Sequence, residues 1–112
     1  MRFALLRTET AEDGVKYFTF VLEGEMVTIE LMFYNYKSSF KTEWTNLISD
    51  MEAHEFGQLT FDDCNGSAPI MTKDGFTTFR VDRHGGNGAG RITVKMHNAL
   101  CLPAFKEAVA QL

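Results

Sequence analysis

Residues 15–34 read VKYFTFVLEGEMVTIELMFY and predict two antiparallel strands joined by a tight turn at Glu23-Gly24-Glu25. Apolar side chains recur at every second position, which places them on one face of each strand. They are Phe18, Phe20 and Leu22 before the turn, and Val27, Ile29, Leu31 and Phe33 after it. Such alternation is typical of an antiparallel sheet with one face in solvent. The strands expected in this part of the chain are Phe3–Thr8, Val15–Leu22 and Met26–Tyr34.

An amphipathic helix is predicted to follow, starting after Ser38 or Ser39, either of which can cap its first turn. Its apolar residues recur at intervals of three and four and form one stripe. They are Phe40, Trp44, Leu47, Ile48 and Met51. Gly57 is a suitable stop, because glycine readily adopts the left-handed conformation that ends many helices.

Short strands and a second helix are predicted for the rest of the chain. The strands expected are Leu59–Phe61, Ile70–Met71, Phe76–Val81 and Arg91–Met96. Asn98 can cap the final helix, and Pro103 fits its first turn, where proline costs no hydrogen bond. The order βββ-α-ββββ-α predicts an α+β fold, a mostly antiparallel sheet of six to seven strands with two helices packed on one face. Residues 1–112 are expected to form a single domain.

The composition limits the classes of partner. Lys and Arg number 11 against 15 Asp and Glu, a net charge of −4, whereas nucleic-acid-binding domains are usually basic. No apolar run approaches the roughly 20 residues of a membrane span. The apolar start ends at Leu6, too early for a secretory signal. We therefore expect a cytoplasmic protein that binds neither nucleic acid nor membrane.

The charge is also unevenly distributed along the chain. Residues 1–72 carry five basic and twelve acidic side chains, a net charge of −7. Residues 73–112 carry six basic and three acidic side chains, a net charge of +3. A surface divided in this way suits a protein partner that is itself charged.

No grouping of residues in the sequence predicts catalysis or a cofactor. His54, His84 and His97 form at most pairs with a cysteine, whereas a zinc site needs three or four converging ligands. Adjacent carboxylates such as Asp62-Asp63 are more typical of a solvated turn than of an acid–base pair. We therefore expect no metal, no cofactor and no enzymatic activity.

The two cysteines, Cys64 and Cys101, are expected to be reduced thiols, because a small secreted scaffold would carry more of them. Cys101 lies near the start of the last helix, a position that can activate a thiol. Leu100 and Leu102 on either side of it predict instead that it is buried and inert.

Residues 85–90 read GGNGAG and are expected to form a hairpin loop. A phosphate-binding glycine loop opens a helix, whereas a strand follows here. Arg83, His84 and Arg91 flank this stretch, so it could serve as a contact loop. An alternative interpretation is a small enzyme or ligand-binding domain with a cleft near His84, Arg91 and His97.

Tyr34 and Tyr36 are the predicted anchors of a protein interface. Successive aromatic residues of a strand cannot all face the core, so Tyr34 is expected to point outward and Tyr36 to lie in the loop before the helix. Exposed tyrosine is favoured at protein interfaces because it offers a large area at low entropy cost. The other predicted contacts are the acidic helix residues Glu43, Asp50 and Glu52.

Four segments resemble those of small bacterial immunity proteins of contact-dependent toxin systems. They are Phe40-x-x-x-Trp44-x-x-Leu47, Gln58-Leu59-Thr60-Phe61, Gly90-Arg91-Ile92-Thr93-Val94 and Leu102-x-x-Phe105-x-x-x-Val109. The resemblance implies a cytosolic, non-enzymatic inhibitor that binds one toxin tightly. The leading interpretation is thus a protein-binding module that blocks a basic toxin or defence effector through an acidic, aromatic surface.

Two other interpretations stay open. A phage-encoded inhibitor of a host defence complex would share these features. An assembly subunit would form a homodimer through the exposed edge of the strand Phe3–Thr8, because an unpaired strand edge readily accepts another strand.

Overall fold

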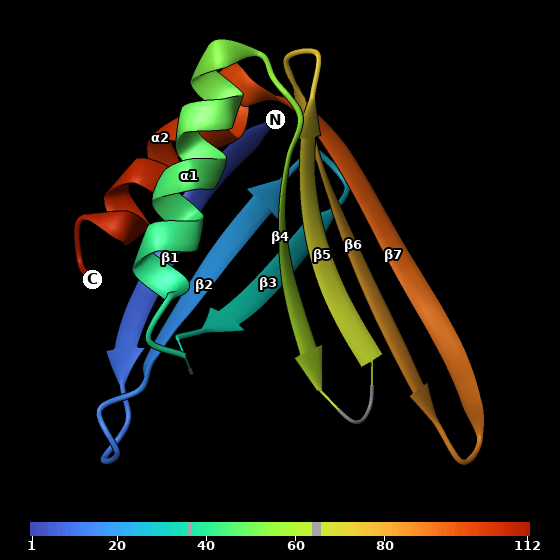
Figure 1. The fold of residues 1–112 in the computed structure, drawn as a ribbon. Coiled ribbons are helices and arrows are strands. Elements are labelled where there is room, and N and C mark those ends of the chain that lie inside the picture. The colour runs from blue at the N-terminus through green and yellow to red at the C-terminus, as the bar shows by residue number, and fades with distance from the viewer. Residues whose placement is uncertain (36, 64–65) are drawn as a thin grey trace.

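The computed structural model describes residues 1–35, 37–63 and 66–112, which form seven strands and two helices (Figure 1). In chain order they are β1 (Arg2–Thr10), β2 (Lys16–Glu23), β3 (Thr28–Tyr34), α1 (Phe40–Ala53), β4 (Gly57–Asp63), β5 (Gly66–Lys73), β6 (Phe76–Gly85), β7 (Gly88–His97) and α2 (Asn98–Val109). The α+β class and the predicted order of elements are confirmed. Within the described residues, neither helix is long and apolar enough to cross a membrane.

The strands divide into two antiparallel sheets. One contains β1, β2 and β3 in that order, and the other contains β4, β5, β6 and β7 in that order. The division falls at α1, because a helix between β3 and β4 rules out the short turn that would pair them as a hairpin. The alternation within each hairpin predicts the pairing of neighbouring strands, but not the separation into two sheets.

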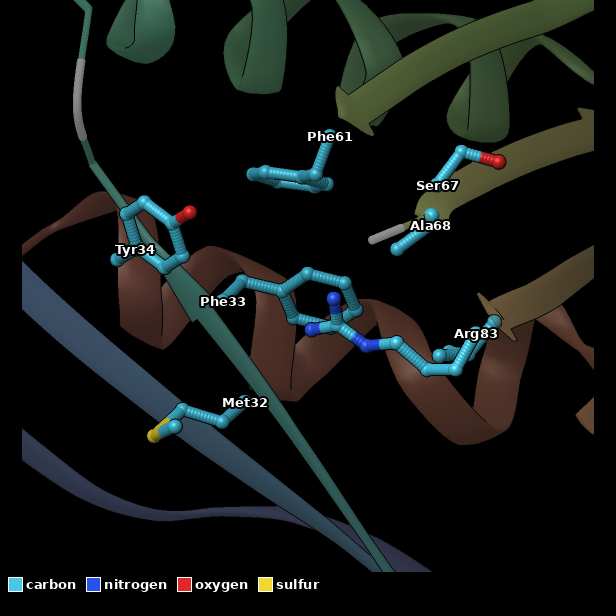
Figure 2. A pocket seen from close by; sticks show the side chains of 9 residues that line it. Met32, Phe33, Tyr34, Phe61, Ser67, Ala68 and Arg83 are labelled. Atoms are coloured by element: carbon cyan, nitrogen blue, oxygen red, sulfur yellow. The ribbon is translucent and has the colours of Figure 1, made fainter. Parts of the chain in front are cut away.

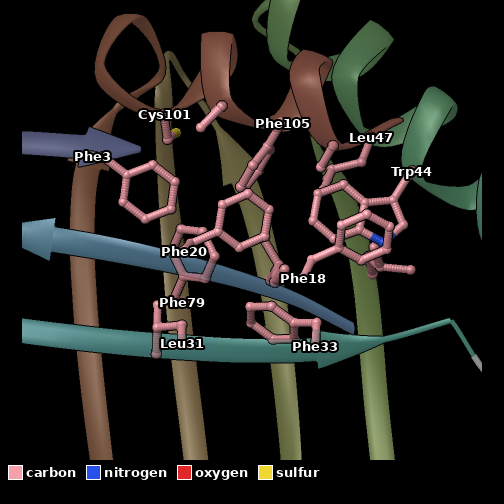
Figure 3. Close-up of a cluster of buried hydrophobic side chains, with 14 of the residues drawn as sticks. Phe3, Phe18, Phe20, Leu31, Phe33, Trp44, Leu47, Phe79, Cys101 and Phe105 are labelled. Atoms are coloured by element: carbon pink, nitrogen blue, oxygen red, sulfur yellow. The ribbon is translucent and has the colours of Figure 1, made fainter. Parts of the chain in front are cut away.

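The two sheets face each other, and the strands of one run across those of the other (Figure 3). Both helices lie side by side at one end of this sandwich (Figure 1). Phe105 of α2 joins the layers, since its ring lies 5.5 Å from the ring of Phe20 on β2 and 5.5 Å from that of Phe79 on β6. Its ring also lies 4.9 Å from that of Trp44 on α1. One core therefore serves both sheets and both helices.

The apolar stripe predicted for the first helix is confirmed. Its five residues are all buried in α1. The predicted stop is wrong, because His54, with a φ of 57°, is the left-handed residue that ends the helix. Gly57 instead begins β4, where an added Cβ atom would lie 2.5 Å from Oδ2 of Asp50. Ser39 holds the cap position, but its side chain makes no capping hydrogen bond to the backbone.

The start of α2 differs from the prediction. His97 holds the cap position, and Asn98 is the first helical residue, with a buried side chain. Pro103 consequently lies inside the helix and not in its first turn. Proline has no N–H to donate to the carbonyl of Ala99, but Ala99 is exposed, so water can reach that carbonyl.

Asn98 joins three elements at one point. Its Nδ2 donates to the carbonyl of Met51 in α1 at 3.1 Å, and its Oδ1 accepts a hydrogen bond from Thr77 Oγ1 in β6 at 2.6 Å. Its backbone N–H donates to the carbonyl of Gly75 at 2.9 Å. Gly75 and Asp74 form the turn between β5 and β6, and both have the positive φ that this two-residue hairpin turn requires.

The far part of the β6–β7 hairpin extends beyond the sheet that covers its near part (Figure 1). Phe79 and Met96 are buried near the helices, whereas Arg83 and Ile92, on the same face, are exposed. We call residues 80–93 the hairpin arm. The predicted hairpin is confirmed, although the strands continue into the glycine-rich stretch and leave only residues 86–87 as the turn.

Two apolar residues of the predicted strands are in solvent. Val27 is 56% exposed because it precedes β3, which begins at Thr28. Ile92 is 50% exposed because it lies on the hairpin arm, where no second sheet covers it.

Candidate functional site

A small cleft opens where the end of β3 meets the inner face of the four-stranded sheet (Figure 2). We call it the corner cleft. Its lining consists of Met32, Phe33 and Tyr34 of β3, Phe61 of β4, Gly66, Ser67 and Ala68 of β5, and Val81 and Arg83 of β6. These residues come from both sheets, so the cleft exists only when the two sheets are packed together.

The floor of the corner cleft is apolar and buried. The rings of Phe33 and Phe61 lie 4.7 Å apart, and the two residues are only 2% and 8% exposed. Phe33 also packs against Phe79, with ring centroids 6.2 Å apart. Aromatic pairs at these distances stabilise a core beyond the area that they bury. The floor is therefore continuous with the hydrophobic core.

The rim of the corner cleft combines an aromatic, a cationic and a flexible side chain. Tyr34 is half-buried, and its ring lies 5.7 Å from that of Tyr17 on β2. Arg83 reaches from β6 toward Phe33 and Tyr34 (Figure 2). Met32 is 63% exposed on the β3 side. Tyrosine and arginine most often carry the binding energy of protein interfaces, and methionine adapts to irregular partner surfaces.

The size of the corner cleft limits what it can accept. Its volume is about 40 Å³. Pockets for small-molecule substrates and cofactors usually enclose about 300–1,000 Å³, whereas about 10–15 Å³ is enough to hold one water. The cleft therefore has room for the tip of one side chain and not for a cofactor.

The hairpin arm beside the cleft carries a cluster of opposite charges. Asp82 accepts a hydrogen bond from Arg91 Nε, and its other carboxylate oxygen lies 3.2 Å from Arg80 Nε. The hydrogen bond from Arg91 lowers the pKa of Asp82, and the charges of Arg91 and Arg80 reinforce the effect. One carboxylate thus pairs with two guanidinium groups, so the arm keeps a positive charge.

The predicted acidic contacts do not form one surface. Glu43 lies 3.0 Å from Lys37 Nζ and accepts a hydrogen bond from Ser39 Oγ. Glu52 faces the second helix, where Lys106 Nζ lies 3.4 Å from its carboxylate. Asp50 is half-buried against Gly57. Residues 43 and 50 share one side of α1, but residue 52 lies on the opposite side at about 100° per residue.

The predicted tyrosines have different outcomes. Tyr34 lies in the corner cleft, together with Arg83 from a strand nearly fifty residues away. Tyr36 lies outside the described residues. Among the predicted contacts, Tyr34 therefore lies in the corner cleft, next to Met32 and Arg83.

The alternative cleft near His84, Arg91 and His97 forms only in part. His84 and Arg91 share an open hollow along the hairpin arm. His97 lies at the opposite end of β7, six residues from Arg91, or roughly 20 Å along an extended strand. Its ring instead packs on Phe76 at a centroid distance of 4.3 Å.

Cys101 is a free, fully buried thiol, as its leucine neighbours predicted. Burial raises its pKa to about 11, so the reactive thiolate is scarce at neutral pH. Cys64 lies outside the described residues. Among residues 1–35, 37–63 and 66–112, no three His, Cys, Asp or Glu side chains are grouped closely enough to hold a metal ion.

Sequence reasoning missed Met32 and Val81 and treated Arg83 only as a neighbour of the glycine-rich stretch. The alternation of β6 carries the missing signal, because Phe79, Val81 and Arg83 occupy one face and an arginine ends an otherwise apolar row. What the alternation does not show is that β3 of the other sheet lies next to this row.

The fold and the cleft together define a small α+β sandwich with an apolar hollow at the junction of its two sheets. Comparison with protein-family models matches residues 28–107 to a family of unknown function, DUF5766. The chain belongs to this family, whose matched region includes the corner cleft and the hairpin arm. Neither the search of curated proteins nor the search of solved structures finds a match.

Proposed function

We propose that this protein is a non-enzymatic binding module of the immunity or inhibitor type, which docks a partner protein at the corner cleft and blocks it. The observation that carries the proposal is the combination of Tyr34 and Arg83 at the rim of an apolar hollow. Interface hot spots have this composition, with an aromatic and a guanidinium group beside a pocket that takes one partner side chain.

The size of the cleft fits one side chain of a partner protein. A hollow of about 40 Å³ accepts a single apolar side chain from a partner. Met32, exposed beside it, and Ile92 on the hairpin arm extend the apolar area in two directions. Exposed apolar residues around a preformed pocket are typical of protein-binding surfaces.

The acidic residues have a secondary part in this proposal. Glu43 and Glu52 already form ion pairs with Lys37 and Lys106. Surface pairs of this kind contribute little to stability, so a basic partner can replace the lysines. Their charge would steer the approach of such a partner and add little to the strength of the final complex.

Affinity capture from the source cells tests the proposal. The wild-type protein should recover one stoichiometric partner, whose own activity falls when the complex forms. Tyr34→Ala and Arg83→Ala should each weaken the complex by about 30-fold, the effect of losing a hot-spot residue.

Matched controls are available on the same chain. Phe56→Ala removes an aromatic side chain that is 60% exposed, and Arg2→Ala removes an exposed arginine on β1. Both controls should keep full binding. Equal binding by all four variants would refute the proposal, and so would recovery of a partner whose activity is unaffected by the complex.

A further inference from the structure

The last strand of the four-stranded sheet has an open edge. β7 pairs with β6 on one side and is the terminal strand of its sheet. Most of its residues, including Lys95, are exposed, whereas Met96 at the end near α2 is buried. Residues 88–95 therefore present unpaired backbone groups over roughly 25 Å, counting about 3.3 Å per residue. We call these residues the β7 edge.

The side chains of the β7 edge alternate between polar and apolar, which limits the kind of strand that can pair with it. On the outer face of the sheet, Arg91 and Lys95 lie on either side of Thr93. On the other face, the side chains are Ile92 and Val94, and Ile92 is half in solvent. A strand added to this edge would meet cations on one face and apolar side chains on the other.

The β7 edge has two cations, Arg91 and Lys95, and they differ in whether a carboxylate neutralises them. Arg91 already binds Asp82 across the hairpin. Lys95 contacts no carboxylate among the described residues, and its Nζ lies 4.8 Å from the ring centre of Phe76. A carboxylate on an added strand opposite Lys95 would complete a cross-strand ion pair.

The same charges argue against pairing with a second copy. The β7 edge and the remainder of its strand contain no Asp or Glu. In a two-fold pairing that keeps both sheets facing the same way, Arg91 and Lys95 would meet only cations or uncharged residues. Opposed like charges destabilise a sheet, so the edge selects a strand of different composition.

We infer that the β7 edge binds an extended peptide segment in which carboxylates alternate with apolar side chains, so that the segment becomes a fifth strand of the sheet. This site is separate from the corner cleft, because β7 contributes no residue to the lining of the cleft. Backbone hydrogen bonds would supply most of the affinity, and Lys95 would supply the charge preference.

A synthetic peptide tests the inference. The probe is an end-blocked eight-residue peptide in which glutamate alternates with valine, and amide hydrogen exchange is followed by NMR. We expect new protection at every second amide of the β7 edge, because only alternate residues of a strand face outward.

Charge reversal tests the proposed preference. Lys95→Glu should weaken binding of the glutamate peptide about tenfold, since it replaces an attractive cross-strand pair with a repulsive one. A peptide with lysine in place of glutamate should bind this variant more tightly than it binds the wild type. Lys41→Glu reverses an exposed lysine on α1 and should leave binding unchanged, and Tyr34→Ala should also leave it unchanged.

Several results would overturn the inference. One is peptide binding without protection of β7 amides, and another is equal binding by the wild type and Lys95→Glu. Equal binding of a thymidine oligonucleotide with the same net charge would show that the edge attracts anions without recognising a strand. Protection that rises with protein concentration in the absence of peptide would show that a second copy occupies the edge.

Discussion

The two ends of the β6–β7 hairpin share one alternation of side chains but differ in what covers them. Near α2, Phe79 and Met96 are buried in the core that both sheets share. On the hairpin arm, Arg83 and Ile92 continue the same face into solvent. The comparison shows that alternation fixes which way a side chain points, whereas the opposing sheet decides whether it is buried.

The core end should carry most of the stability. Phe105→Ala removes a ring that packs against Phe20, Phe79 and Trp44, and it should lower the free energy of unfolding by about 3–5 kcal/mol. Urea unfolding followed by circular dichroism measures the loss. Ile92→Ala on the hairpin arm is the matched comparison and should cost less than about 1 kcal/mol, because the side chain is half exposed. Similar losses for both variants would contradict the difference between the two ends.

The junction at Asn98 should have the next largest effect. Asn98→Ala leaves the Thr77 hydroxyl and the Met51 carbonyl without their buried partner, which should cost about 2–3 kcal/mol of unfolding free energy. Asn46→Ala, an exposed change on α1, should cost far less. The same urea experiment measures both variants. An Asn98→Ala protein as stable as the control would show that water replaces the lost hydrogen bonds.

The buried thiol offers a kinetic test of the core end. In a Cys64→Ser background, Cys101 should react with iodoacetamide at pH 8 about 100-fold more slowly than an ordinary thiol, because its pKa is raised to about 11. Concentrated urea should restore the ordinary rate. The raised pKa also sets the sign of the pH dependence of stability. Above about pH 9 the thiol ionises more readily in the unfolded chain than in the folded protein, so the free energy of unfolding should decline there and stay constant below that pH. A fast reaction without urea would show that α2 opens readily.

The hairpin arm should show the smallest effect. NMR titration should give Asp82 a pKa below that of an ordinary aspartate, and Arg91→Gln should raise this pKa because it removes the largest cause of the shift. The lowered pKa means that any stabilisation is present above about pH 4 and disappears as the pH falls through the folded-state pKa. Asp82→Asn should lower the urea midpoint at pH 7 only slightly, because ion pairs at the protein surface contribute little to stability. A clear loss of stability would mean that the arm helps to hold the core.

Local patterns predicted much of this fold. The stripe from Phe40 to Met51 and the alternation from Phe18 to Phe33 depend only on neighbours in sequence, and the structure confirms both except at Val27. The division into two sheets could not be predicted, since it depends on how the β3 end passes into α1. Asn98 shows the same limit, because its side chain satisfies partners 21 and 47 residues away and not its own helix.

The candidate site was predicted only in part. Tyr34 follows from the rule that neighbours in a strand point to opposite faces. The contribution of Arg83 could not be found, because it depends on the crossing of two sheets that local patterns do not reveal. The acidic helix residues were overestimated as partner contacts. Glu43 and Glu52 contribute to the negative charge of residues 1–72, but in the structure each forms an ion pair with a lysine.

The turn at the tip of the β6–β7 hairpin is a suitable place for an insertion. Side-chain atoms added at Gly86 would meet nothing within 4 Å in the described part of the chain. A guest sequence placed between residues 86 and 87 would therefore project into solvent, because loop tips of this kind tolerate insertion. We expect insertions at this turn to leave the rest of the domain folded, so that one scaffold would display hairpins of different lengths.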